Sequence, residues 1–151
     1  MKLPDSITKR DLLFGARRAS SGEILTLGKG YASEGLLSDA IDFFVKADAK
    51  TEIEGLVSRV VEEGDMFLLL KIARVIGEER VSHDTILKCT ERAKSLGKIR
   101  YAIMGFEKLG QKAQAEALRD TVAQDGDIVA FREAETFVAP NLEEIQAPEE
   151  V

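Results

Sequence analysis

Residues 27–47, LGKGYASEGLLSDAIDFFVKA, place two glycines inside a helix-forming stretch and then set Ala40 and Phe44 four residues apart. Glycines in such a stretch can form a loop that cradles a phosphate, or they can lie where two helices press close together. The two arrangements predict different functions, so the choice between them comes first.

The sequence does not fit a phosphate-binding loop. Such a loop needs a glycine, four further residues and then Gly-Lys-Ser or Gly-Lys-Thr, because backbone amides ring the phosphate and the hydroxyl holds magnesium. This chain has Gly22, five residues and then Gly28-Lys29-Gly30, so the spacing is wrong and the hydroxyl is missing. No buried strand precedes the glycines to act as a scaffold. The stretch therefore favours close helix packing.

Apolar residues recur at intervals of three and four from Asp5 to about Phe137, which is the period of a helix with one buried face. The three prolines lie near the two ends, so none interrupts this region. We therefore predict an all-α fold of about eight or nine helices and no strand. The expected helices span residues 5–19, 22–34, 36–48, 51–63, 66–76, 83–96, 98–109, 112–124 and 127–136.

Short breaks separate these helices. Gly35, Gly64, Gly77 and Gly97 are each placed to end one helix a residue or two before the next begins, which makes successive helices antiparallel neighbours. Ser82 is placed to cap the helix that follows it.

The chain also repeats itself. Aligning Gly35, Gly64 and Gly97 gives a period of 29 and then 33 residues. Five and nine residues after each glycine stand a small and a large residue, in either order. These pairs are Ala40 and Phe44, Leu69 and Ala73, and Ala102 and Phe106. A small residue opposite a large one lets two helices interdigitate, and periods of this size are typical of stacked helical hairpins.

At these residues the chain resembles the tetratricopeptide repeat, whose pattern runs Trp, two residues, Leu-Gly, two residues, Tyr, later Ala, three residues, Phe, and then Pro. Residues 21–54 match it at Ile24 (in place of Trp), Leu27, Gly28, Tyr31, Ala40, Phe44 and Ala47. The closing Pro is missing, since its place falls at about Glu52. Residues 83–116 match only the second half of the pattern, and residues 50–82 keep little of it.

The resemblance implies an α-solenoid of stacked antiparallel helical hairpins in residues 21–137. Gly28 would then let the two helices of one hairpin approach, and Tyr31 would fill the space between them. A generic helical bundle or another solenoid of helical hairpins is the alternative.

Charge divides the chain into three parts. Residues 1–20 form a predicted basic N-terminal helix with five basic and two acidic side chains, whereas residues 120–151 hold one basic and nine acidic side chains. Residues 138–151 are an acidic tail that we expect to be disordered, because it holds few large apolar groups to bury. The net charge of −6 and the lack of a basic stripe among aromatics make nucleic acid an unexpected partner.

No catalytic, cofactor or metal site is predicted. Cys89 and His83 are single residues of their types, so they can form neither a disulfide nor a Cys/His metal cluster. We interpret Cys89 as a core residue. The longest apolar run, Met66 to Leu70, has five residues against about 18 for a membrane span, and the N-terminus lacks a signal sequence. We therefore expect no membrane insertion and a cytoplasmic location.

In the resembled family the first helix of each hairpin lines an inner wall. Carried over repeat by repeat, this wall comprises Leu25, Lys29, Ala32, Ser33, Glu54, Ser58, Val61, Glu62, Leu87, Glu91, Lys94 and Ser95. The predicted protein-binding residues among them are Leu25, Lys29, Ser33, Ser58, Glu62, Leu87, Glu91 and Lys94.

The expected function is that of a non-enzymatic interaction module, a scaffold or adaptor that binds a peptide or protein segment on this wall. The alternative is a regulatory or accessory subunit, whose apolar ends are covered by a larger assembly or by copies of itself.

Overall fold

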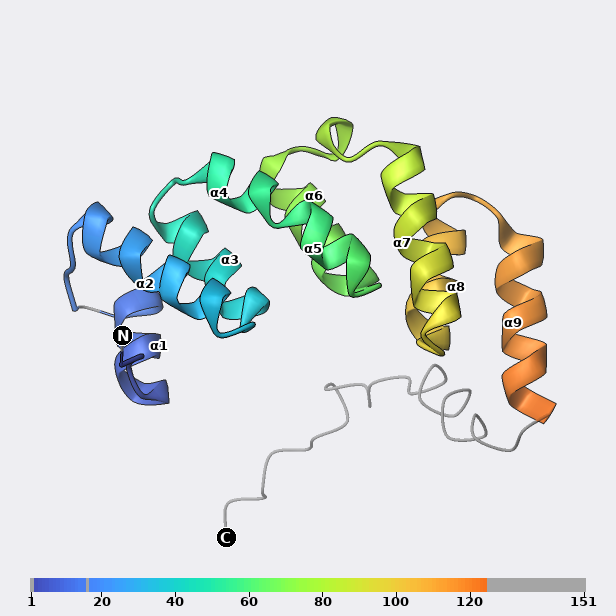
Figure 1. The fold of residues 1–151 in the computed structure, drawn as a ribbon, viewed down its shortest axis with the longest axis horizontal. Coiled ribbons are helices and arrows are strands. Elements are labelled where there is room, and N and C mark those ends of the chain that lie inside the picture. Colours follow the sequence, from blue (N-terminus) through green and yellow to red (C-terminus); the bar gives the residue numbers. More distant parts are fainter. Residues whose placement is uncertain (1, 16, 125–151) are drawn as a thin grey trace, which may run out of the picture.

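The computed structural model describes residues 2–15 and 17–124, and every regular element in these ranges is a helix (Figure 1). The α-helices are α1 (Ser6–Phe14), α2 (Ser21–Ser33), α3 (Leu37–Lys46), α4 (Lys50–Gly55), α5 (Val57–Glu62), α6 (Met66–Ile76), α7 (His83–Ser95), α8 (Ile99–Lys108) and α9 (Lys112–Gln124). A 3-10 helix, η1 (Glu78–Arg80), joins α6 to α7. The predicted all-α class is confirmed for this part of the chain, where no helix is long and apolar enough to cross a membrane.

Two predicted helices differ from the structure. The first ends at Phe14 and not at residue 19, because the chain turns away from the helical conformation at Gly15 and Ser20 then forms a capping box with Glu23 at the start of α2. The helix predicted over residues 51–63 is divided into α4 and α5 by a turn at Leu56. The helix predicted over residues 127–136 and the acidic tail, residues 138–151, lie outside the described residues.

The helix ends form a regular series. The predicted terminators Gly35, Gly64, Gly77 and Gly97 all have positive φ, as do Asp48, with φ of 54°, and Gly110, with φ of 74°. They fall into the pairs 35 and 48, 64 and 77, and 97 and 110. Within each pair the two positive-φ residues are 13 residues apart, so the part of the chain that the structure describes contains three hairpins with the same spacing between their two terminating residues.

The paired helices form two layers. We call α2, α4, α5 and α7 the first-helix layer, and α3, α6 and α8 the second-helix layer. Within the hairpins α2 packs on α3, α5 on α6, and α7 on α8; between hairpins α5 contacts α7, and α6 contacts both α3 and α8. The helices follow one another in chain order along a curved row, with α1 against α3 at one end and α9 against α8 at the other (Figure 1).

Helix α6 lies in the middle of this row (Figure 1) and contacts α3, α4, α5, α7 and α8. Leu69 and Ala73, which follow Gly64 in the repeat, are both buried, and so are Met66 and Ile72. Ala102 and Phe106 hold the same positions in α8 and are buried as well.

The opening stretch is a site of close helix packing, as predicted. Gly28 is buried in α2, and a Cβ atom built on it would lie 2.6 Å from Cε1 of Phe44 and 3.2 Å from Cβ of Phe43. Tyr31 stacks on Phe43 with ring centroids 5.0 Å apart, and its hydroxyl donates a hydrogen bond of 3.3 Å to the carbonyl of Pro4. Ala40 is fully buried. Glycine thus brings α2 and α3 together, and tyrosine fills the space beside the contact.

The third hairpin also has a glycine where its two helices are in close contact, at a position that the alignment of the repeats did not include. Gly105 lies in α8, where a Cβ atom would lie 1.9 Å from Oγ1 of Thr90 on α7. Thr90 is fully buried and its hydroxyl donates to the carbonyl of Ile86 at 2.7 Å. Helix α8 can therefore approach α7 this closely only with glycine at residue 105.

We expect Gly28→Ala to be about 1–3 kcal/mol less stable than Gly22→Ala, because the added methyl group overpacks against Phe44. Gly22 is the matched control: it lies in the same helix, and nothing is within 4 Å of a Cβ atom built there. The two substitutions share the gain in helix propensity from glycine to alanine. Denaturant unfolding followed by circular dichroism measures the difference, and equal unfolding free energies would show that the α2–α3 contact is loose.

Candidate protein-binding surface

The predicted binding residues all lie in the first-helix layer. Leu25, Lys29 and Ser33 are on α2, Ser58 and Glu62 on α5, and Leu87, Glu91 and Lys94 on α7. All except Leu25 are exposed; Leu25 is half-buried and packs against the core. Of the other residues carried over from the resemblance, Ala32, Glu54 and Val61 are half-buried and Ser95 is exposed. We call the eight predicted residues the first-layer stripe.

Helical spacing puts the stripe on one side of each helix. On α7 the residues stand at i, i+4 and i+7, and on α5 at i and i+4, so their side chains are neighbours on one helix face. Leu87 is 38% exposed and is the apolar member of the stripe on α7. The positions carried over from the resemblance are therefore accessible, apart from the half-buried Leu25.

Two arginines that the sequence analysis missed hold successive helices of this layer together. Arg59 on α5 donates from Nη1 to the carbonyl of Ala32 in the last turn of α2 at 2.9 Å. Arg92 on α7 donates from Nε to the carbonyl of Glu62 at the end of α5, also at 2.9 Å. Each arginine stands five residues before the glycine that ends its hairpin's first helix, Gly64 or Gly97. An arginine at the same repeat position thus donates to the preceding helix in two successive hairpins. Its constant distance of five residues from Gly64 or Gly97 is the sequence feature that could have predicted these contacts.

The charged side chains of the stripe differ in how they are used. Lys29 pairs with Glu52 on α4 at 3.1 Å, with both side chains well exposed. Glu62, Glu91 and Lys94 form no ion pair within the described residues. The carbonyl of Glu62 accepts from Arg92, but its carboxylate is left to the solvent. Three of the four charges on the stripe are therefore available to a partner without loss of an internal ion pair.

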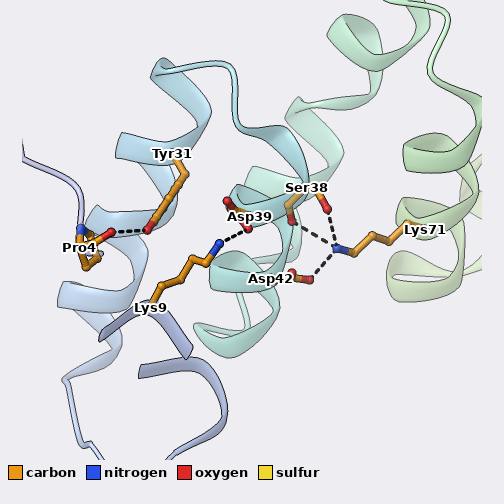
Figure 2. Close-up of polar contacts among 7 residues, drawn as sticks. All are labelled: Pro4, Lys9, Tyr31, Ser38, Asp39, Asp42 and Lys71. Carbon is orange, nitrogen blue, oxygen red and sulfur yellow. Dashed lines mark hydrogen bonds and ion pairs between the residues drawn. The ribbon is translucent and has the colours of Figure 1, made fainter. Parts of the chain in front are cut away.

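The second-helix layer has a different polar network, shown in Figure 2. Lys9 of α1 pairs with Asp39 of α3 at 3.0 Å, and this hydrogen bond raises the pKa of Lys9. Lys71 of α6 pairs with Asp42 of α3 at 2.7 Å and also donates to the carbonyl and hydroxyl of Ser38 at 3.2 Å. The two aspartates of α3 therefore bind the helices on either side of it, a structural role that occupies both carboxylates.

A hollow of about 300 Å³ lies beside the turns that join α2 to α3 and α5 to α6. Its lining includes three carboxylates, and each already has a structural partner. Asp39 accepts from Lys9 at 3.0 Å, Glu63 from Arg59 at 3.0 Å, and Asp65 caps the N-terminus of α6. The hollow therefore offers no carboxylate free for acid or base chemistry.

Residues suited to metal or thiol chemistry are not brought together. Within residues 2–15 and 17–124 no group of three or more His, Cys, Asp or Glu could hold a metal ion. Cys89 is fully buried, and burial raises the pKa of its thiol to about 11. His83 is exposed at the start of α7. The interpretation of Cys89 as a core residue is confirmed.

Comparison with models of known protein families, with curated proteins and with solved structures finds no match to this chain.

We expect the Cys89 thiol to be inert in the native protein and reactive in the unfolded chain. Burial excludes the reagent, and a thiol with a pKa of about 11 holds little thiolate at pH 8. Titration with a chromogenic disulfide at pH 8, with and without guanidinium chloride, measures both states. Rapid reaction without denaturant would contradict the packing of α7 against its neighbours.

Proposed function

We propose that the chain is a non-enzymatic interaction module that binds a peptide or protein segment along the first-layer stripe. The three hairpins would then form an α-solenoid of the tetratricopeptide type. The equal 13-residue spacing of the paired positive-φ residues supports the solenoid, and the recurring arginine donors of α5 and α7 support a repeated relation between successive hairpins.

One observation carries the proposal. Glu62, Glu91 and Lys94 are exposed on α5 and α7, two helices of this layer that contact each other, and none of the three forms an ion pair with another residue of ranges 2–15 and 17–124. The internal contacts between these helices use arginine side chains and backbone carbonyls instead. The contact between α5 and α7 therefore leaves these three charges unused, whereas Lys29 on α2 pairs with Glu52 on α4.

The stripe also indicates what kind of segment would fit. Neighbouring helices pack about 8–10 Å apart, and an extended chain advances about 3.3 Å per residue, so about three residues of a bound segment would cross each helix. Lys29 on α2 favours an acidic group. Glu62 on α5 favours a basic group, and Lys94 on α7, which contacts α5, favours an acidic group about three residues further along. The ion pair between Lys29 and Glu52 is an obstacle of only about 0–1 kcal/mol, because both side chains are exposed.

Reversing two charges of the stripe should reduce capture of the physiological partner. We expect Lys29→Glu/Lys94→Glu to lower recovery of that partner at least tenfold, a loss of about 1.4 kcal/mol in binding. Affinity purification with quantitative mass spectrometry, run beside the unmodified chain, measures recovery.

The matched control is Lys46→Glu/Arg74→Glu, which changes the net charge by the same amount on the exposed side of the second-helix layer. Lys46 lies on α3 and Arg74 on α6, and both are exposed. Equal losses in the two variants would point to net charge, and equal recovery in all three proteins would show that the stripe is not the binding surface.

The alternative, an accessory subunit of a larger assembly, draws on a different observation. Ile7 and Phe14 on α1 are 68% and 79% exposed at one end of the row, as an end that another subunit covers would be.

Light scattering at micromolar concentration separates the two functions. The interaction module predicts the mass of a single chain, 16.6 kDa, because it needs no other subunit to fold. A stable larger mass at that concentration would favour the assembly subunit.

A further inference from the structure

The outward face of α1 combines exposed apolar and basic side chains. Ile7, Arg10 and Phe14 stand at i, i+3 and i+7 and therefore share one face of this helix. The opposite face carries Leu12 and Leu13, which are buried where α1 packs on α3. Ile7 and Phe14 are the most exposed of the large hydrophobic residues in the described part of the chain, and no described helix covers them.

Basic groups outnumber acidic ones at this end of the chain. Lys2, Arg10, Arg17 and Arg18 are all exposed. This end has two acidic groups in its described residues. Asp5 is the N-cap of α1, where it accepts from the amide of Thr8 at 2.8 Å, and Asp11 pairs with Arg10 at 3.4 Å, an exposed pair worth about 0–1 kcal/mol. A ligand for the face must therefore supply apolar side chains together with negative charge.

The chain itself contains a segment with that composition. Residues 125–138 follow α9 and contain two pairs of acidic side chains, each pair followed by a group of apolar side chains. These are Asp125, Asp127, Ile128, Val129, Phe131, Glu133, Glu135, Phe137 and Val138, with Arg132 as the single basic group. Over residues 125–151 eight side chains are acidic and one is basic, against five basic and two acidic in residues 1–20.

The distance between α9 and α1 indicates whether residues 125–138 of the same chain or of a neighbouring copy can contact the outward face of α1. Helices α1 and α9 lie at opposite ends of the row (Figure 1), and four steps of helix packing between them amount to about 30–40 Å. The chain from residue 125 to Phe137 spans at most about 45 Å when fully extended. Ile128, Val129 and Phe131 follow α9 too closely to reach α1 of the same chain. Phe137 could reach it only at a large cost in conformational entropy, whereas a neighbouring copy has no such constraint.

We propose that the outward face of α1 is a docking site for residues 125–138 of a neighbouring copy, with Ile7 and Phe14 contacting the apolar side chains of that segment and Arg10, Arg17 and Arg18 its carboxylates. Each copy has one donor segment, which follows α9 in the chain, and one acceptor face on α1, so copies associate through these two parts of the chain. The contact is small and charge-assisted, so it forms as protein concentration rises and weakens with salt.

Paramagnetic relaxation between full-length chains tests the docking. A nitroxide is attached to Ala139→Cys in unlabelled protein, while the buried Cys89 stays unmodified. This protein is mixed with ¹⁵N-labelled chain that lacks the added cysteine, so signal loss reports contacts between copies only. We expect the amides of Ser6–Phe14 to lose most of their intensity while those of α4 to α8 keep theirs.

Matched variants in the ¹⁵N-labelled chain identify the contact. Ile7→Ser/Phe14→Ser should restore the α1 signals. Val45→Ser/Phe67→Ser should leave the loss unchanged, because these residues are 46% and 54% exposed on the other helices α3 and α6. All four positions are exposed, so the core is intact in both variants. Arg10→Glu/Arg17→Glu should reduce the loss, and so should 1 M salt, at which charges are screened beyond about 3 Å.

Three results would overturn the proposal. Signal loss on α1 only when label and ¹⁵N are in the same chain would mean that the segment folds back on its own helices. Loss centred on α2, α5 and α7 would place the segment on the first-layer stripe. Concentration-dependent shifts of α1 signals without relaxation from the label would mean that the folded part of a second copy covers this face.

Discussion

The structure depends on how closely the two helices of a hairpin approach each other. At Gly28 the backbone of α2 lies against the ring of Phe44, and at Gly105 the backbone of α8 lies against Thr90. Burial of one aromatic or branched side chain contributes about 1.5–3 kcal/mol, whereas an exposed ion pair contributes about 0–1 kcal/mol. Apolar contacts such as those of Phe43 and Phe44 therefore contribute most of the stability of a hairpin. The lysine and arginine contacts contribute less, and they orient one hairpin relative to the next.

The sequence predicts the parts of this fold that depend on local chemistry. Helices α6 and α9 have the predicted bounds, and Gly64 and Gly97 end helices where the spacing places them. The first helix was predicted too long although Ser20 and Glu23 stand three residues apart, a capping-box spacing that marks the true start of α2. The turn at Leu56 carries no such mark. The 13-residue spacing of the terminating residues could not be seen in the sequence, because Asp48 adopts a left-handed conformation where the other two hairpins have glycine.

The surface is less predictable than the core, and the reason is physical. Glu62, Glu91 and Lys94 were predicted by carrying over the inner wall of the resembled family, and all three are exposed. The sequence pattern does not show where the end of another helix will lie, and the hydrogen bonds of Arg59 and Arg92 to backbone carbonyls depend on that position. The ion pair of Lys29 with Glu52 also joins separate helices. Since the stripe sits on a framework fixed by small and large core residues, its charges can vary without affecting the fold, and the fold alone carries little information about the ligand.

The two exposed surfaces differ in chemistry, and this difference constrains how they can act. The first-layer stripe is mostly charged and polar, so binding there would depend on electrostatic complementarity, which governs association rate and specificity more than affinity. The face of α1 carries two of the largest exposed apolar residues beside basic groups, so contact there would also bury apolar area. Because α1 packs on α3 in the second-helix layer, whereas the stripe lies on α2, α5 and α7, both surfaces can be occupied together. A chain joined to its neighbour through α1 would then present several stripes to one long partner, and the gain in affinity would come from effective concentration and need no new contact on any stripe.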